Sequence, residues 1–414
     1  MADVTNPIAD VPMQPVTATA PLRVPLFRNL WMAAVVSYTG SWMQQVGAAW
    51  LMTMLTTSPF MVALVQAAMA LPVFLVVLPA GALADMVDRR RLLLFSQVWM
   101  MIAAAALGVC ELMGVCTPWT LLGFTFLLGL GAVLNDPAWQ AITPEVVPPH
   151  LLQPAVALNS AGFNIARAVG PALAGFVIAG FGSGWAFVIN AASFLGVIVI
   201  LYLWKNPPHP SPQPMKKMMD SVGEGLRFMR ATAPARSVLV RTGLFSLFAA
   251  AFWALLPLIA RPHGSVGLGL MVGCFGLGAL AGAGVLPRLR KKISTDGVVA
   301  ASSALFAAVV FSYARIGSFP LLCAVLFAGG TAWIGMLTSL NVSAQLMAPR
   351  HLRARALSMY LLVLQGGLAG GSAVWGEVAE RWSPQVALSV AALGLVAGLL
   401  TLGRHSLDAP QNLG

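Results

Sequence analysis

One cation stands inside a long apolar stretch of this sequence. Arg167 is the only Lys or Arg within an apolar run of about 20 residues, in ALNSAGFNIARAVGPALAG at 157–175. A cation there costs about 3 kcal/mol, so we expect it to face water or a partner. Asp136 is the nearest carboxylate in depth, and Asn164 precedes Arg167 by one helical turn. These residues predict either a permanent ion pair joining two helices or a site for an anionic substrate or a proton.

A second group of charges is concentrated in GALADMVDRRR at 81–91, although only 9% of the chain is charged. Its candidate residues are Gly81, Asp85, Asp88, Arg89, Arg90 and Arg91. Three Arg in a short connection between apolar runs hold that connection on the cytoplasmic side of a membrane. This topological role does not need Gly81 or the two Asp. Gly81 permits close helix approach, and Asp85 can accept hydrogen bonds from a helix N-terminus or an Arg.

Uncharged amides also fall within apolar runs. They are Gln44, Gln45, Gln66, Asn341 and Gln365. An amide in a membrane helix either lines a polar cavity or bonds to a neighbouring helix, and the sequence leaves both roles open.

The remaining reactive residues argue against metal and nucleotide chemistry. The four Cys and five His show no metal-ligand spacing, and no Gly-rich phosphate loop occurs. We therefore expect no metal, no cofactor and no ATP-driven pump. An enzyme would need a converging acid, base, nucleophile or metal, and the polar residues inside the apolar runs offer no such set.

The elements that position these residues are long apolar helices. The chain is 58% hydrophobic, against 45–50% for an ordinary soluble domain, and runs of about 20 residues recur along it. The runs do not alternate as barrel strands do, so we predict an all-α membrane protein. The twelve predicted spans are 30–55, 60–84, 92–113, 118–139, 158–180, 185–204, 240–260, 265–287, 297–315, 319–341, 356–376 and 384–403.

The net charge of +11 is distributed by side rather than clustered for nucleic acid. With twelve spans, twenty of the 24 Lys and Arg lie on the side of the N-terminus, three on the other side, and Arg167 within a span. The positive-inside rule places both termini in the cytoplasm. Attraction to anionic lipid accounts for the charge, so the bilayer and not a polynucleotide is the expected partner.

The chain divides into two halves. We predict a disordered tail (1–25), a six-helix bundle (26–204), a Pro-rich linker with a short amphipathic helix (205–237), a second six-helix bundle (238–404) and a cytoplasmic tail (405–414). GALADMVDRRR at 81–91 aligns with GAGVLPRLRKK at 282–292, and PHLLQPAVAL at 149–158 with PRHLRARALS at 349–358. The nearly equal offsets indicate a repeat, a common way to build a transporter with its site between the halves.

These motifs resemble the major facilitator superfamily. Its loop between the second and third helices reads Gly-x-Leu-Ala-Asp-Arg-x-Gly-Arg-Arg/Lys, which GALADMVDRRR matches except at Met86 and Asp88. FRNLW at 27–31, NDPAWQAITPEVV at 135–147 and ALNSAGFNIARAVGPALAG are similar to its enterobactin-exporter-like, or transmembrane secretion effector, branch. The resemblance covers nearly the whole chain.

The resemblance implies roles for several residues. It implies a latch between the halves made by Asp85, against the start of the eleventh span near Arg353 and Arg355. It also implies that the first, fourth, seventh and tenth helices line a central cavity, which favours Gln44, Gln45, Trp253 and Asn341. Gly170, Pro171 and Gly175 resemble an export-type helix motif, which plain helix packing also explains. Thr125 stands where many drug–proton antiporters carry an Arg, a departure from the usual coupling.

The sequence thus favours a secondary transporter that exports a small organic molecule across the inner membrane by alternating access, driven by protons. We expect a monomer. The alternatives are uptake of a small solute through the same fold and, from another class, a membrane receptor or enzyme.

Overall fold

The computed structural model describes residues 17–204, 232–349 and 352–401, except for the side chains of 78–86, 233, 354 and 401. The described chain is almost wholly helical. Its long helices are α1 (Pro25–Leu55), α2 (Pro59–Met86), α3 (Arg89–Leu112), α4 (Pro118–Val146), α5 (Leu152–Phe181), α6 (Ser183–Leu203), α8 (Ala233–Ala260), α9 (Gly264–Leu289), α10 (Thr295–Tyr313), α11 (Phe319–Leu346), α12 (Arg353–Arg381) and α13 (Pro384–Gly398).

The helices begin where the sequence places starting signals. Proline occupies the first turn of α1, α4 and α13, where its missing N–H costs no hydrogen bond. Asp88 caps α3 and Thr117 caps α4, each accepting a backbone N–H of the first turn. Gly182, with φ of 91°, is the single residue between α5 and α6 and allows the sharp reversal.

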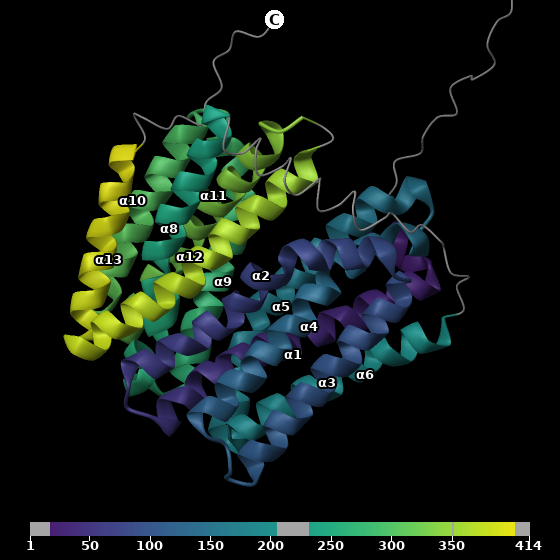
Figure 1. Cartoon of the computed structure of the whole chain (residues 1–414), viewed down its shortest axis with the longest axis horizontal. Helices are drawn as coiled ribbons and strands as arrows, with labels where there is room; N and C mark the ends of the chain where they lie inside the picture. Colours follow the sequence, from purple (N-terminus) through teal and green to yellow (C-terminus); the bar gives the residue numbers. More distant parts are fainter. Residues whose placement is uncertain (1–16, 205–231, 350–351, 402–414) are drawn as a thin grey trace, which may run out of the picture.

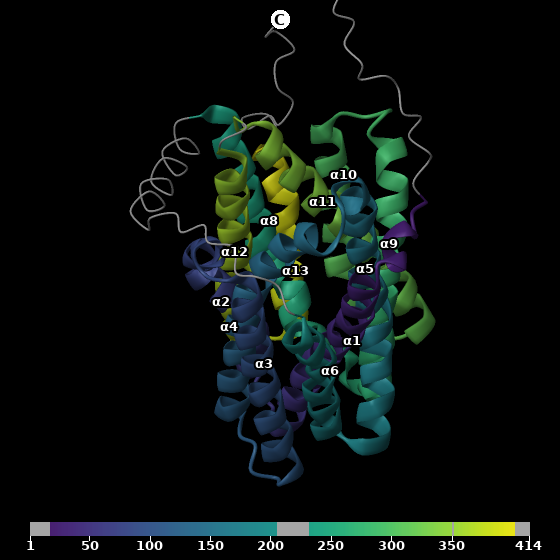
Figure 2. The same ribbon diagram turned by 90° about the vertical axis from the view of Figure 1, so that its right-hand side faces the viewer.

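The helices form two bundles that lie side by side (Figure 1). The first bundle is α1–α6, and the second is α8–α13. They meet along a seam in which α2 packs on α12 and α5 packs on α9, and Figure 2 shows the same bundles from the side. We call the end with connections 87–88, 147–151 and 290–294 the basic end, and the end with 56–58, 113–117, 261–263, 314–318 and 382–383 the opposite end.

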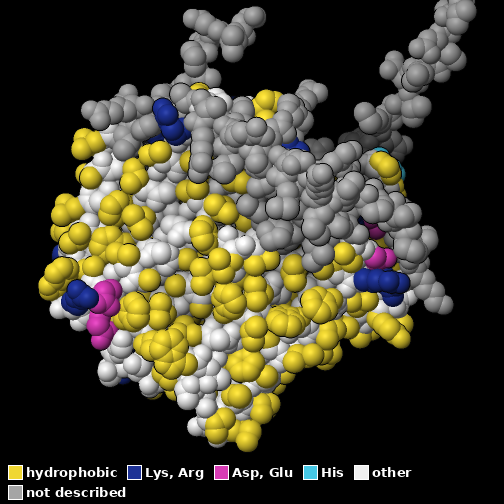
Figure 3. Space-filling view, viewed as in Figure 1, with side chains coloured by type: hydrophobic (Ala, Val, Ile, Leu, Met, Phe, Trp, Pro, Cys, Tyr) yellow, Lys and Arg dark blue, Asp and Glu magenta, His cyan; other side chains and the backbone are white. Residues whose placement is uncertain are grey.

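The outer surface suits a lipid environment. Nine segments of the described chain are long and apolar enough to cross a membrane, and one of them, 234–289, runs through both α8 and α9. Large apolar side chains cover the face in Figure 3, with charged side chains toward its margins. The helix α13 has only 15 residues and α1 is not among the nine, so the number of twelve crossings stays a prediction.

Some boundaries differ from the sequence prediction. Residues 20–23, placed in the disordered tail, form a 3-10 helix whose Pro21 is buried, and α1 begins at Pro25. The helix α8 begins at Ala233, inside the predicted linker. Most of the linker, with its predicted amphipathic helix, and the tail 405–414 lie outside the described residues.

Candidate functional site: the seam and the cavities beside it

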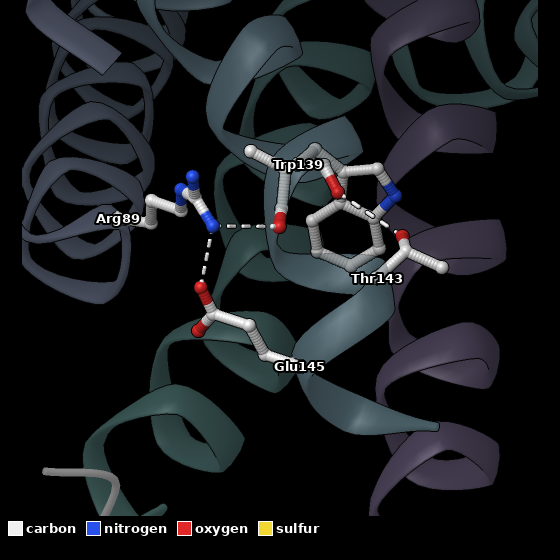
Figure 4. A network of polar contacts seen from close by, with 5 residues as sticks. Arg89, Trp139, Thr143 and Glu145 are labelled. Atoms are coloured by element: carbon white, nitrogen blue, oxygen red, sulfur yellow. Dashed lines mark hydrogen bonds and ion pairs between the residues drawn. The ribbon is translucent and has the colours of Figure 1, made fainter. Parts of the chain in front are cut away.

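Arg89 binds the start of α3 to the end of α4. Its Nη1 lies 2.6 Å from Glu145 Oε1 and donates to the carbonyl of Ala141 at 3.3 Å (Figure 4). Beside this contact the Thr143 hydroxyl donates to the carbonyl of Trp139 at 3.2 Å. The charged loop is thereby fastened to its own bundle.

Arg90 and Asp88 act on helix ends of the same bundle. Arg90 donates from Nε to the Leu201 carbonyl at 2.6 Å and from Nη2 to the Tyr202 carbonyl at 2.9 Å, in the last turn of α6. A cation at this helix end satisfies free carbonyls and complements the helix dipole. The Asp88 carboxylate accepts the Arg91 N–H at 2.9 Å, which makes Asp88 the cap of α3.

The latch predicted for this loop is not tested by these contacts. The surroundings of Gly81 and the side chain of Asp85 are not among the described features, so the latch stays a prediction. Arg89, Arg90 and Asp88 have local partners that the sequence analysis did not assign.

Arg167 lies on the seam among aromatic rings. Its Cζ is 5.8 Å from the ring centroid of Trp42 on α1 and 6.0 Å from that of Phe275 on α9, which belongs to the other bundle. The ion pairs found among the described residues do not include one between Arg167 and Asp136. The cation is therefore held by ring faces from both bundles, an arrangement that favours a guanidinium.

Asp136 and Asn164 face a cavity of about 500 Å³ in the first bundle, between α1, α4 and α5. We call it the basic-end cavity, since it is lined by the last third of α4 and the first third of α5. Tyr38 and Gln140 contribute further polar groups to its wall. Asn164 Nδ2 donates to the Ser160 carbonyl at 2.8 Å, which leaves its Oδ1 available to a bound group.

A smaller seam pocket of about 50 Å³ is formed by both bundles. Trp42, Gln45 and Gln66 line it from the first bundle, and Trp253 and Leu268 from the second. The Trp253 ring is fixed edge-on to its neighbours, with its centroid 4.8 Å from that of Phe275 in an aromatic cluster of the second bundle. Packing against these rings restricts the positions that the Trp253 ring can take.

A third space, the amide pocket, measures about 280 Å³ and lies within the first bundle beside the seam. Gln44, Gln45 and Gln365, all predicted as cavity residues, line it, and so do Gln66 and Asn190. Gln365 lies on α12, so the second bundle also contributes to the wall of this pocket. The structure thus brings four of the five amides named from the sequence to one pocket.

Asn341 is placed differently. Its Oδ1 accepts from Gln345 Nε2 at 2.6 Å on its own helix, and it is not among the residues that line the three spaces. Conversely, sequence reasoning missed Asn190, Tyr38 and Trp42. Asn190 interrupts an apolar run just as Gln44 does, so the criterion that selected Gln44 would have found it.

The export-type motif lies at the closest approach of the bundles. A side-chain carbon at Gly175 would come within 2.8 Å of the Ser265 carbonyl, and one at Gly269 within 2.4 Å of the Pro171 carbonyl. A side-chain carbon at Gly170 would similarly lie 2.7 Å from Trp42 Cβ on α1. The small residues of α5 therefore let three helices touch backbone to backbone.

The bundles are also joined at the opposite end. Glu380, at the end of α12, accepts from the Ser58 hydroxyl at 2.6 Å and from the Phe60 N–H at 3.1 Å, at the start of α2. A side-chain carbon at Gly376 would lie 2.5 Å from Ala63 Cβ, so the helices are in contact there. This carboxylate is a cross-bundle cap on α2. In the described part of the chain, no three His, Cys, Asp or Glu side chains gather as a metal site.

The sequence of the chain is similar to those of known proteins over most of its length. A family model described as transmembrane secretion effector matches residues 16–412. The enterobactin exporter EntS of Citrobacter koseri is 26% identical over 402 residues, which are 91% of each chain. The uncharacterized MFS-type transporter YfiS of Bacillus subtilis is 30% identical over 233 residues, 54% of each chain.

Solved structures share the fold. A POT family transporter superposes with a TM-score of 0.74 at 11% identity, over 91% of this chain and 95% of that one. The nucleoside transporter NupG superposes with a TM-score of 0.69 at 14% identity, over 92% of this chain and 98% of that one. At such identities the likeness concerns the fold alone.

Proposed function

The chain belongs to the transmembrane secretion effector family of the major facilitator superfamily, and on that premise we propose that it is a secondary transporter exporting a small organic molecule across the inner membrane. The family prediction made from the loop motif is confirmed. Substrate, direction and energy coupling are the parts that we propose.

One arrangement carries the proposal: polar spaces adjoin the seam of two bundles that are fastened together at one end. The amide pocket and the basic-end cavity offer polar groups within the first bundle, while Glu380 joins α12 to α2 at the opposite end. A transporter that alternates access needs a site between two bundles and breakable contacts at either end of them. At Gly175 and Gly269 the backbones of the two bundles meet with no side chain between them, so one bundle can tilt against the other there.

The orientation follows from charge. We propose that the basic end faces the cytoplasm, because Arg and Lys in short connections are retained there. The basic-end cavity would then receive substrate from the cell interior, as an exporter requires. Monomeric action in the bilayer is consistent with a site formed by the two bundles of one chain.

Proton coupling is proposed for the same cavity. Asp136 is an exposed carboxylate on its wall, next to the Tyr38 side chain, and a carboxylate in a wet cavity can bind and release a proton. Arg167 lies farther along the same helix as Asn164 and can attract an anionic group of the substrate.

Inside-out membrane vesicles test direction and coupling together. Enterobactin is the first compound to try, because the relatives that match over 91% of this chain are named as its exporters. Vesicles with the protein, acidified inside, should accumulate it faster than vesicles from cells with an empty vector. A protonophore should abolish the difference. Faster loss of preloaded compound would support uptake into cells instead, and flux that a protonophore leaves unchanged would refute proton coupling.

A further inference from the structure

Gln44 carries a buried hydrogen-bond donor without a protein partner. The side chain is only 6% exposed, and its Nε2 has no partner among the described residues. Its Oε1 accepts from Asn190 Nδ2 at 3.4 Å. A buried donor without a partner is costly, so such a group usually has an acceptor supplied from elsewhere.

The Gln44 amide lies in a small network of polar groups. Asn190 Nδ2 donates to Gln44 Oε1 at 3.4 Å, and the Ser193 hydroxyl donates to the Asn190 backbone carbonyl at 2.7 Å and lies 3.4 Å from Asn190 Oδ1. In this arrangement the Gln44 oxygen has a partner and its nitrogen does not. Asn190 is 1% exposed, so water has little access to the pair.

The Gln44 side chain lines the amide pocket. Its Nε2 is itself buried, so a group bound in the pocket would reach that donor through a turn of the amide. Gln66 and Gln365 add two more amides to its wall, and Met69, Met100 and Phe194 add apolar surface. Among the residues that the structure describes, the lining contains no Asp, Glu, Lys or Arg. A charged group placed there would lose its hydration without gaining a counter-ion, whereas an uncharged acceptor would gain the Gln44 donor.

The pocket is connected to the proposed transport route. Gln45, Gln66 and Met69 line both the amide pocket and the seam pocket, so the two spaces share a wall. Gln365 comes from the second bundle, so movement of the bundles would change the pocket. At about 280 Å³ it is at the small end for a ligand site, which fits one group of a larger molecule.

We propose that the amide pocket is a substrate subsite for an uncharged hydrogen-bond acceptor, such as an amide or ester carbonyl, bound by Gln44 Nε2 and flanked by Gln66 and Gln365. This inference names part of the substrate chemistry and rests on the proposed transport function. It implies that the exported compound carries a neutral carbonyl-bearing portion.

Three probes with the same ring and different charge test the subsite: N-benzylacetamide, benzylammonium and phenylacetate. Their binding to the full-length protein in lipid nanodiscs is measured by saturation-transfer NMR. N-benzylacetamide should bind saturably, and the two charged probes should not displace it. Gln44→Leu and Gln66→Leu should each weaken binding by about threefold to tenfold, the effect of one lost hydrogen bond.

Gln97→Leu is the matched control. Gln97 is 3% exposed and also has a free buried atom, Oε1, but it does not line the pocket. If Gln44→Leu does not fold, Gln66→Leu carries the test, because Gln66 is only partly buried.

The proposal is overturned by absent binding of N-benzylacetamide at millimolar concentration, by equal binding of a charged probe, or by unchanged binding in both pocket variants. The last outcome would assign the free donor to water alone. Binding needs no flux, so a subsite that binds in a protein without export activity would refute the proposed function and not the subsite.

Discussion

The two bundles differ in the kind of polar group that they bury. The buried amides among the described residues, Gln44, Gln97, Asn135 and Asn190, all belong to the first bundle. Buried polar groups of the second bundle are hydroxyls, apart from Arg241. A hydroxyl can bond to its own helix, as Thr242 does to the Val238 carbonyl and Ser372 to the Leu368 carbonyl, both at 2.7 Å. An amide has two N–H donors and an acceptor oxygen, so one bond to its own helix still leaves groups that need other partners.

The apolar cores of the two bundles also differ, in how continuous they are. Most of the second bundle's core is one large cluster that extends across the seam, beside a small separate cluster near the basic end. Rings of Phe252, Trp253, Phe275, Phe306 and Trp333 meet in the large cluster at centroid distances of 4.8–6.2 Å. The first bundle divides its core into separate clusters, with the amide pocket and basic-end cavity beside them. We infer that the first bundle supplies most of the ligand-facing polar groups, with Gln365 added from the second, and that the aromatic core of the second bundle forms a rigid wall.

The strongest test of this difference removes one ring from each bundle. Phe252→Ala should cost about 3–5 kcal/mol of unfolding free energy, because Phe252 is fully buried among four rings. Phe194→Ala should cost less, since Phe194 already borders the amide pocket. Thermal unfolding in detergent measures both. Phe327→Ala, at a ring 42% exposed, is the control. Equal losses of unfolding free energy for Phe252→Ala and Phe194→Ala would contradict the inference that only the second bundle is rigid.

A smaller effect is expected from the ion pairs near the basic end. Arg241, with a side chain 3% exposed, pairs with Asp296, whereas Arg89, 37% exposed, pairs with Glu145. Asp296→Asn should destabilise by about 3 kcal/mol, since it leaves a buried cation, and Glu145→Gln by less than about 1 kcal/mol. Chemical denaturation of both variants measures the difference. A larger loss for Glu145→Gln would mean that the first bundle depends more on its charges.

The next prediction concerns the contact between bundles at the opposite end. Glu380→Gln weakens the cap on α2, an exposed contact worth about 1 kcal/mol, so separation of the bundles at that end should become about fivefold more populated. Spin labels at Val115→Cys and Gly317→Cys, on connections of different bundles, report this separation in a variant without native cysteines. Glu377→Gln is the control, since Glu377 pairs with Arg381 on its own helix. A distance distribution unchanged by Glu380→Gln would mean that Glu380 does not hold the bundles together at the opposite end.

Sequence predicted the local parts of this architecture well. The helix α6 spans Ser183–Leu203 where 185–204 was expected, because an apolar run of that length is a local signal. The helix α8 begins at Ala233 rather than 240, since helices continue past the apolar run into polar residues that composition assigns to a linker. Polarity within apolar runs marked Gln44, Gln45 and Gln365 as candidates, but it left open whether each lines a cavity or bonds to a helix, and it did not predict that they share one pocket.

Contacts that depend on helix rotation were not predictable in this way. Depth along the membrane suggested Asp136 as a partner of Arg167, yet depth does not say which face of a helix a residue occupies. The guanidinium instead lies against Trp42 and Phe275, whose sequence neighbourhoods carry no sign of a cation. The same holds for Arg89 with Glu145, 56 positions apart.

Arg167 gives the smallest and sharpest test, because it belongs to the first bundle but touches a ring of each. Arg167→Lys keeps the charge and loses the planar guanidinium, so transport should fall by about twofold to fivefold, the effect of 0.5–1 kcal/mol. Double-mutant cycles with Trp42→Leu and Phe275→Leu separate the two rings, since the cost of each single change cancels. Coupling to both rings would make Arg167 a link between a ligand-binding bundle and its rigid partner. Coupling to Trp42 alone would mean that Arg167 interacts only with rings of its own bundle. Arg167 would then not link the two bundles.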